Sequence, residues 1–471
     1  MSMSEMPADM VTPETIPNFL MLEQIPANYV QQLETDLLEP VVFSNGAAST
    51  DGFARFTLQN KGFLHSHSKI FIGLKPAAGV TRAFLQPHVG IGQIIKKAVL
   101  KVGNKTLNEL DSWAGLYAVK SCLITNENNL EREMYTTGRY VHHEFNYNRG
   151  SRSIAQTYGL DTGIEYESSN GDVELPDWYV MSGAKPEECP TFQIDLSDLF
   201  PFLKVNQLPL FMMKEPINIE LTFQPTVDKR VQIQSGETAS TATEIVRDDL
   251  KFCADYIFYG ATDEMERYAA ANQDLSFSFV DYRLVEATTN HTALGSGIVR
   301  NLGMANRVVP RVITLLPAAD QAEATILGEN NSMAPTVSAS GVQTGLKYNV
   351  RYNDRYEYTS DIDNIARLFS EFTQAEGVPF LTRQEYSGQG RLAGGITTDT
   401  FMGRAQNTNL NGQTFYMGTK LTNGRVGQRG LELHLTGTFP SSGRQVTLLR
   451  SYCEYVRVAR LTNGMMELYN A

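Results

Sequence analysis

The sequence predicts an all-β protein made of two consecutive eight-stranded jelly-roll β-sandwiches, with short inserted helices and long loops. Three observations favour this fold class: short runs of alternating apolar and polar residues, a composition rich in strand and turn residues, and an order of elements that recurs in the second half. The 471 residues include 37 Gly, 21 Tyr and 23 Phe, and only 20% are charged. This composition is typical of strands and turns, and it excludes a disordered chain or a coiled coil. At roughly 150 residues per domain, the length allows two or three cores.

We expect residues 1–48 to form an extended acidic arm, residues 49–270 the first jelly roll and residues 271–471 the second. Five prolines in the arm exclude a long helix, although a short helix near residues 27–37 also fits the pattern. Residues 1–54 hold eight acids and no Lys or Arg, so they supply −8 of the formal net charge of −12. Because a segment without cations cannot replace the counterions of phosphates, the arm is not a nucleic-acid-binding tail.

Alternation in the first half predicts a series of half-buried strands. It begins where Ala54, Phe56 and Leu58 fall on one face of the chain. The same period recurs in five more segments: Lys69–Leu74, Ala98–Val102, Phe192–Leu196, Ile217–Phe223 and Phe252–Phe258. A long polar excursion, residues 125–190, separates two of them and is typical of functional surface loops.

Two helices are expected between these strands. Gly103 and Asn104 form a tight turn, residues 105–107 return as a second strand, and Asp111 or Ser112 caps a helix over Trp113–Leu123. Near the end of the first half, Asp263 and Glu266 form a capping pair for a short helix through Ala271. We place the boundary between the two rolls near residue 270.

The second half repeats the order of the first. Shifting the sequence by 250 positions lays residues 351–355 over residues 101–105 and places Asp361 on Asp111. A second helix is expected over Ile362–Ala375, ending at Gly377. At an offset of 199, residues 454–456 match residues 255–257, each in a strand that would close its half. The two offsets differ, so we expect a shared plan with different loop lengths.

The sequence gives no indication of a membrane span or a secretory signal. No apolar run approaches 18 residues, and residues 1–10 carry two acids and no basic residue. The four cysteines contain no C-x-x-C pair, so we expect reduced core thiols rather than disulfides or zinc ligands. They are Cys122, Cys189, Cys253 and Cys453. Three N-x-S/T sequons, at Asn104, Asn290 and Asn330, are interpreted as chance.

Several segments superficially resemble metal or phosphate sites. His65 and His67 would project from one face of an extended chain, but no third or fourth ligand is in view. His142-His143-Glu144 begins like a zinc protease motif, yet Tyr147 occupies the position of its second histidine. Asp361-x-Asp363 begins like a calcium loop, but Ala366 and Phe372 replace the glycine and glutamate that such a loop requires, so it is interpreted as a helix cap. Gly388-Gln389-Gly390 and Gly394-Gly395 are interpreted as a mobile loop, not a phosphate cradle.

Other catalytic and binding templates also fail. The acids Asp195 and Asp198, or Glu187 and Glu188, could form a glycosidase pair, but any chain with about fifty acids offers such pairs. No G-x-S-x-G elbow is present. Basic residues occur in twos and look like solvated strand ends or subunit contacts rather than a nucleic-acid platform. They are Lys96-Lys97, Lys229-Arg230, Arg149 with Arg152, and Arg425 with Arg429. We therefore predict no catalytic, cofactor-binding or metal-ligating residues, and no cofactor.

Two segments carry a resemblance to a known family. Leu208-Pro209-Leu210 stands before the strand Ile217–Phe223, and the strand residues 255–258 lead into the helix residues 264–269, which contain Arg267. Together they resemble the end of the first jelly roll, and the linker to the second, in double jelly-roll major capsid proteins of nucleocytoplasmic large DNA viruses, virophages and polinton-like viruses. Lys214-Glu215-Pro216 departs from the His-Glu-Val that the large-virus members tend to show. The modest size favours a small member of the group, such as a polinton-like virus or virophage.

The resemblance implies a structural protein without enzymatic activity, located in the virion. Members form pseudo-hexameric homotrimers that tile an icosahedral shell around a DNA genome. The implied partners are copies of the chain, neighbouring capsomers, penton and minor capsid proteins, or an internal membrane, without sequence-specific binding of nucleic acid. The alternative is a carbohydrate-binding or carbohydrate-active β-sandwich protein. It would need exposed aromatic rings beside convergent acids, and the chain has only two Trp, Trp113 and Trp178.

Overall fold

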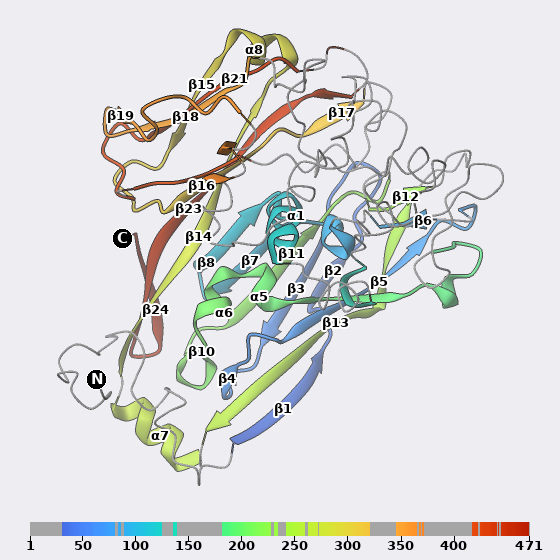
Figure 1. The fold of residues 1–471 in the computed structure, drawn as a ribbon. Coiled ribbons are helices and arrows are strands. Elements are labelled where there is room, and N and C mark those ends of the chain that lie inside the picture. Colours follow the sequence, from blue (N-terminus) through green and yellow to red (C-terminus); the bar gives the residue numbers. More distant parts are fainter. Residues whose placement is uncertain are drawn as a thin grey trace, which may run out of the picture.

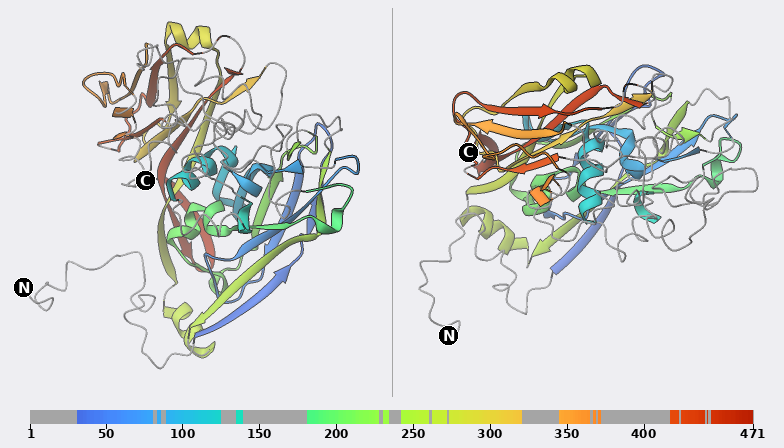
Figure 2. Two further views of the ribbon diagram at one scale, coloured as in Figure 1. Left: turned by 45° about the vertical axis from the view of Figure 1, so that its right-hand side comes forward. Right: turned by 45° about the horizontal axis from the view of Figure 1, so that its top comes forward.

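The protein contains two β-sandwiches, here called the first and second roll, which lie side by side (Figures 1 and 2). The computed structural model describes residues 31–80, 83–85, 89–124, 135–138, 181–227, 230–233, 242–259, 262–271, 273–320, 345–364, 367–368, 370–371, 417–422, 424–439, 441 and 444–470. Among these residues, no helix is long and apolar enough to cross a membrane.

The first roll packs two main sheets face to face. Sheet 1 has the strand order β10-β4-β13-β5-β9, and β1 pairs with the other side of β13; sheet 2 has the order β2-β3-β11-β7-β8. The strands of sheet 1 are β1 (Gln31–Leu38), β4 (Phe63–Leu64), β5 (Lys69–Pro76), β9 (Thr191–Asp195), β10 (Leu208–Pro209) and β13 (Thr243–Tyr259). Those of sheet 2 are β2 (Val42–Ser44), β3 (Gly52–Leu58), β7 (Ile95–Val102), β8 (Lys105–Asp111) and β11 (Ile217–Phe223).

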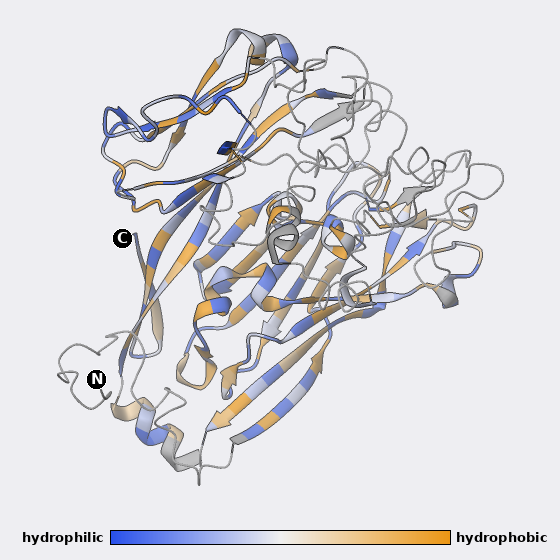
Figure 3. Cartoon of the chain, in the orientation of Figure 1, coloured by the Kyte–Doolittle hydropathy of each residue, from blue (hydrophilic) through white to orange (hydrophobic). Residues whose placement is uncertain are grey.

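The alternating sequence explains why these strands form. In β11 the residues Ile217, Ile219, Leu221 and Phe223 are buried, and the residues between them are only partly covered. The strand lies between β3 and β7. Because successive side chains of a strand point to opposite faces, its buried apolar face points into the sandwich and its polar face points outward. Figure 3 shows the same alternation of hydrophobic and hydrophilic residues along β1 and β13.

Helices and a small sheet complete the first roll. The helix α1 follows β8, as predicted, and Trp113 within it is buried and stacked on Tyr117 at 4.5 Å between ring centroids. The helical segments are η5 (Gly90–Ile94), α1 (Trp113–Ile124), η6 (Pro186–Glu188), α5 (Leu196–Leu199), α6 (Pro201–Val205) and η7 (Leu210–Met212). The small sheet pairs β6 (Ala83–Phe84) with β12 (Gln232–Ile233).

The second roll follows α7 (Thr262–Ala271) and has the same plan. Sheet 3 has the order β14-β23-β16-β20, with β24 also paired to β23; sheet 4 has the order β15-β21-β18-β19. The strands of sheet 3 are β14 (Asp274–Thr288), β16 (Arg311–Leu315), β20 (Met417–Lys420), β23 (Leu448–Thr462) and β24 (Met465–Asn470). Those of sheet 4 are β15 (Ile298–Gly303), β18 (Lys347–Tyr352), β19 (Arg355–Tyr356) and β21 (Leu431–Thr436). Also present are α8 (His291–Ser296) and the pair β17 (Ala318–Asp320) with β22 (Arg444–Val446).

The strand orders confirm the internal repeat. Reading sheet 1 beside sheet 3 matches β1 with β14, β13 with β23, β5 with β16 and β9 with β20. Reading sheet 2 beside sheet 4 matches β3 with β15, β11 with β21, β7 with β18 and β8 with β19. Both predicted turns adopt left-handed backbone, with φ of 55° at Gly103 and 51° at Asn353. The two halves therefore share their topology, not only a few residues.

Four sequence expectations need correction. Residues 31–38 form the strand β1, not a helix, because they pair with β13 along its whole C-terminal part. The strand expected over Phe192–Leu196 ends at Asp195, and α5 begins at Leu196. The helix α7 begins at Thr262, so the expected capping residue Asp263 lies inside its first turn.

The fourth correction concerns the helix expected from Ile362. Ile362 instead forms a backbone bridge with Tyr348. Residues 367–368 and 370–371 are helical, and the side chain of Asn364 accepts a hydrogen bond from the backbone N–H of Arg367 at 2.8 Å. Asn364 is therefore the capping residue in place of Asp361. The expected end at Gly377 lies outside the described residues.

Candidate functional site

The joint between the two rolls is formed by strands of the second roll that extend beyond their own sandwich. Contacts join β14 to β8 and α6, and β24 to β8. Along β14 the side chains of Leu275, Phe277 and Phe279 are buried. The ring of Phe202 in α6 meets Phe277 and Phe279 edge-on, at centroid distances of 5.8 and 5.0 Å. This part of the joint is apolar and closely packed.

A buried carboxylate lies at the centre of the joint. Asp281 is only 3% exposed, and it accepts hydrogen bonds from Asn108 Nδ2 at 3.1 Å, Tyr455 Oη at 3.1 Å and Arg457 Nη1 at 2.8 Å. Arg457 Nη1 also donates to the backbone oxygen of Leu107 at 2.8 Å, so one guanidinium contacts both rolls. Burial raises the pKa of Asp281, and Arg457 and the neutral donors act against that rise. Because each partner has a defined geometry, the network sets one relative position of the two rolls.

Two further contacts extend the joint on either side. The hydroxyl of Tyr452 donates to the backbone oxygen of Ser112 at 2.7 Å, at the start of α1. Gly115 lies so close that an added Cβ would be 2.7 Å from the same hydroxyl, so a larger residue at this position would displace the Tyr452 side chain. At the opposite end of the joint, the backbone N–H of Lys214 donates to the oxygen of Gly464 at 2.9 Å. The contact thus runs from α1 to the β23–β24 turn.

Arg230 is not the solvated residue that the sequence suggested. It is fully buried, and it donates to the backbone oxygens of Gln224 and Thr243, each at 2.8 Å, and to Asn45 Oδ1 at 2.9 Å. Burial lowers its pKa to about 10. The guanidinium satisfies carbonyl groups that approach from three separate segments of the first roll. Arg230 is therefore a structural residue.

Among the described residues, nothing pairs with the outer edge of sheet 1. The strand β1 pairs with β13 on one side, and no described strand lies beyond it (Figure 1). Leu33 and Leu37 on this strand are 60% and 62% exposed. On the opposite face of β1, Glu34 and Asp36 form ion pairs with Lys61. The strand thus presents apolar side chains to solvent while its acids are neutralised locally.

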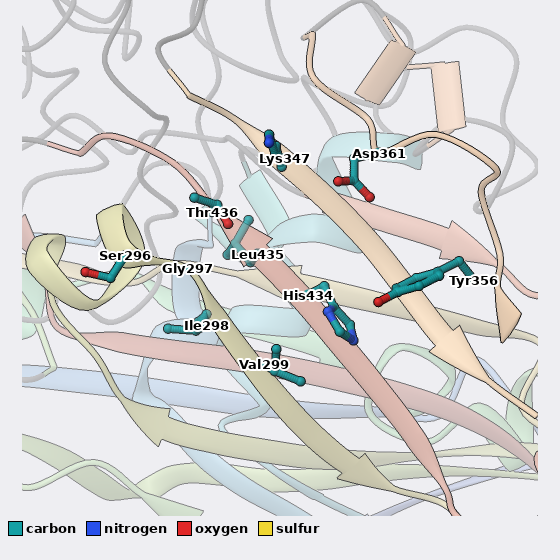
Figure 4. Close-up of a pocket in the computed structure, with 10 residues that line it drawn as sticks. All are labelled: Ser296, Gly297, Ile298, Val299, Lys347, Tyr356, Asp361, His434, Leu435 and Thr436. Atoms are coloured by element: carbon teal, nitrogen blue, oxygen red, sulfur yellow. The ribbon is translucent and has the colours of Figure 1, made fainter. Parts of the chain in front are cut away.

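A shallow pocket of about 280 Å³ lies on the outer face of sheet 4 (Figure 4). Its lining includes Lys347, Tyr356, Asp361 and His434, and the ring of Tyr356 meets His434 edge-on at 5.1 Å. Asp361 accepts a hydrogen bond from Asn349 Nδ2 at 2.8 Å. Glycoside hydrolysis uses two carboxyl groups on either side of the sugar bond, and the lining of this pocket has one.

The predicted histidine pair lies together in the turn between β4 and β5. The rings of His65 and His67 are 5.2 Å apart, but His65 Nδ1 already accepts the backbone N–H of His67 at 2.9 Å. His67 Nδ1 lies 3.6 Å from a carboxylate oxygen of Asp195. Burial and the neighbouring His67 lower the pKa of His65. Within the described ranges, no group of three or more His, Cys, Asp or Glu side chains has a geometry that could hold a metal ion.

The other candidate residues are dispersed. Asp195 ends β9, Asp198 lies in α5, and Glu187 and Glu188 belong to η6, where Glu187 is exposed. Cys253 and Cys453 are buried thiols and Cys189 is partly buried; burial raises the pKa of Cys453 to about 12. Lys96 pairs with Asp51 at 2.7 Å, Lys97 with Glu109 and Asp111, and Arg429 with Asp354.

Several candidates lie outside the described residues: His142, His143, Glu144, Arg149, Arg152, Trp178, Lys229, Asn330 and Gly388 to Gly395.

Sequence reasoning missed the residues that form the joint. Leu275, Phe277, Phe279 and Asp281 alternate on one strand face, so a single acid continues an apolar row. An acid at the end of a row of buried apolar residues predicts a buried carboxylate that has a hydrogen-bond partner. Its partner Asn108 is 173 positions away, and no local pattern identifies it.

Comparison with known proteins gives no match to a family model and no match among the curated proteins. Solved structures do match. A chain of the PBCV-1 virus capsid is 11% identical, with a TM-score of 0.50, over 94% of this chain and 97% of that one. A chain of the Sputnik virophage is 10% identical, with a TM-score of 0.52, over 93% of this chain and 88% of that one. The chain therefore has the all-β double jelly-roll fold of viral major capsid proteins.

Proposed function

We propose that this protein is a structural major capsid protein that forms pseudo-hexameric homotrimers, which tile an icosahedral viral shell around a DNA genome. The observation that carries the proposal is the pair of rolls with one strand order, held in a fixed relation by the Asp281 network. Three copies of such a chain present six similar rolls, which suits a hexagonal building block. The similarity to a PBCV-1 capsid chain over almost the whole length supports the same role.

The proposal includes no catalytic, cofactor-binding or metal-ligating residues and no enzymatic activity. It places the protein in the virion, with copies of itself, neighbouring capsomers, penton and minor capsid proteins, or an internal membrane, as partners. It keeps the division into an arm (1–48), a first roll (49–270) and a second roll (271–471). Within that division, β1 and β2 of the arm pair with strands of the first roll.

Light scattering coupled to size-exclusion chromatography tests the proposal. The purified chain should elute at three times its monomer mass of 52.4 kDa, as a closed threefold ring requires. A glycan array on the same sample addresses the carbohydrate-binding alternative. A stable monomer that binds a sugar saturably would contradict the capsid proposal.

A further inference from the structure

The pocket on the outer face of sheet 4 differs from the equivalent place in the first roll by a missing ion pair. At the offset of 250, Lys347 corresponds to Lys97 and Asp361 to Asp111. Lys97 pairs with Glu109 and with Asp111, the latter at 3.3 Å. Within the part of the chain that the structure describes, Lys347 pairs with no carboxylate, and Asp361 accepts its hydrogen bond from an amide instead.

The return segment of the second hairpin explains why this pair is missing. In the first roll, residues 107–109 of β8 lie opposite residues 99 and 100 of β7. In the second roll, residues 357–361 lie opposite residues 349 and 350 of β18, so five residues stand where the first roll has three. The two added residues shift the register, and the lysine and the aspartate no longer lie opposite each other. The shift opens the pocket between them.

The polar groups that line the pocket are not used by the chain itself. The hydroxyl groups of Ser296, Tyr356 and Thr436 and the ammonium group of Lys347 form no hydrogen bond or ion pair with any described residue. On the equivalent face of sheet 2, the lysines pair with carboxylates of neighbouring strands. The pocket therefore has a cation and several hydroxyl groups that are free to bind a ligand.

The same pocket also offers apolar surface. Figure 4 shows Tyr356 at one end of the pocket, Ser296 at the other, and His434 and Val299 between them. The side chains of Tyr356 and Val299 are 48% and 63% exposed. The volume of about 280 Å³ lies at the lower end of the range for small-molecule sites, roughly 300–1,000 Å³. The pocket is therefore large enough for one small ring with polar groups around its edge.

We propose that this pocket binds one sugar unit that carries a carboxylate. The carboxylate pairs with Lys347, as Glu109 and Asp111 pair with Lys97 in the first roll. Hydroxyl groups of the sugar donate to Asp361, and the C–H face of the sugar ring packs on the ring of Tyr356. Such a ligand supplies the charge, the hydrogen-bond partners and the apolar face that the pocket can accommodate. This binding is a further function and does not depend on the proposed homotrimer.

Saturation-transfer NMR titrations of the purified full chain test the ligand class. The acidic sugars are glucuronic acid and N-acetylneuraminic acid, the neutral sugar is glucose, and acetate supplies a carboxylate without a sugar ring. At least one acidic sugar should bind saturably, and glucose and acetate should each bind about tenfold more weakly, because each lacks part of the contacts. No binding of either acidic sugar at millimolar concentration, or equal binding of glucose or acetate, overturns the proposal.

Substitutions in the pocket test its location. Lys347→Ala should weaken binding of the acidic sugar by about tenfold, and Tyr356→Ala by about fivefold. Lys420→Ala and Tyr469→Ala are the matched controls, since Lys420 is exposed and Tyr469 is 49% exposed, and neither lines the pocket. All four variants should keep the native circular dichroism spectrum, and both controls should bind like the wild type. Pocket variants that bind as tightly as the wild type overturn the location.

Light scattering on the same sample separates this inference from the proposed function. A trimer that binds the acidic sugar supports both. A trimer that does not bind it overturns the sugar site and leaves the capsid proposal in place. A monomer that binds it overturns the capsid proposal and leaves the sugar site in place.

Discussion

At the scale of single residues, the main determinants of the architecture are buried or partly buried charged groups that each have several hydrogen-bond partners. Asp281 and Arg457 join the rolls, and Arg230 joins segments within the first roll. Burying a charge costs several kcal/mol unless neighbouring groups compensate it. Such residues therefore specify one arrangement of the chain rather than simply adding stability.

Replacing Asp281 by Asn should destabilise the protein by about 3 kcal/mol, because it leaves Arg457 without its carboxylate partner in a buried joint. Urea unfolding followed by circular dichroism measures this loss. Asp274→Asn on the same strand is the control. Its ion pair with Arg460 is exposed, so the loss should be below about 1 kcal/mol. Equal losses for the two variants would contradict the role assigned to Asp281.

Replacing Arg230 by Lys should also destabilise the protein, by about 3 kcal/mol, although the charge is kept. A single ammonium group cannot reach the carbonyl groups of Gln224 and Thr243 and the side chain of Asn45 together. Arg429→Lys is the comparison, since Arg429 is an exposed residue paired with Asp354. If Arg230→Lys melts at the same temperature as the wild type, the hydrogen bonds of the buried guanidinium are not needed for stability.

At the scale of elements, the two β-hairpins at equivalent positions show how different residues make one turn. The first uses Gly103 at positive φ, and the second uses Asn353 and Asp354 at φ of 51° and 62°. Asn353 compensates for its strained backbone with its side chain. Its Nδ2 donates to the oxygen of Arg425 at 2.8 Å, and its Oδ1 accepts the N–H of Gly427 at 2.6 Å. The second turn is therefore tied to a neighbouring loop.

Asn353→Ala should destabilise the protein by about 2 kcal/mol, since it keeps the strained φ and loses both side-chain hydrogen bonds. Asn353→Gly loses the bonds and relieves the strain, so its loss should be smaller. Chemical denaturation of both variants gives the comparison. A glycine variant that is less stable than the alanine variant would contradict the role of backbone strain at Asn353.

Elements whose signals are local were predictable from the sequence. The period of two in Ile217–Phe223 and the Gly103-Asn104 turn led directly to β11 and to the β7–β8 hairpin. The apolar period that begins at Ile362 is real, and it predicted a helix from that residue. The backbone of Ile362 instead forms a bridge with Tyr348, so the helix cannot begin there. The strand β1 was missed for a similar reason. It owes its conformation to β13, more than two hundred positions away, and not to its own sequence.

At the scale of the whole molecule, the repeat explains the length and the distribution of charge. Two similar sandwiches account for most of the chain, and the acids of residues 1–54 supply two thirds of the net charge. The joint was not predictable, because its contacts connect residues such as Leu107 and Arg457 across 350 positions.

Single-particle electron microscopy of the purified protein distinguishes the proposed homotrimer from other assemblies. We expect particles of three chains with a hexagonal outline, in which six sandwiches surround one threefold axis. Particles that contain one chain, or two chains related by a twofold axis, would contradict it.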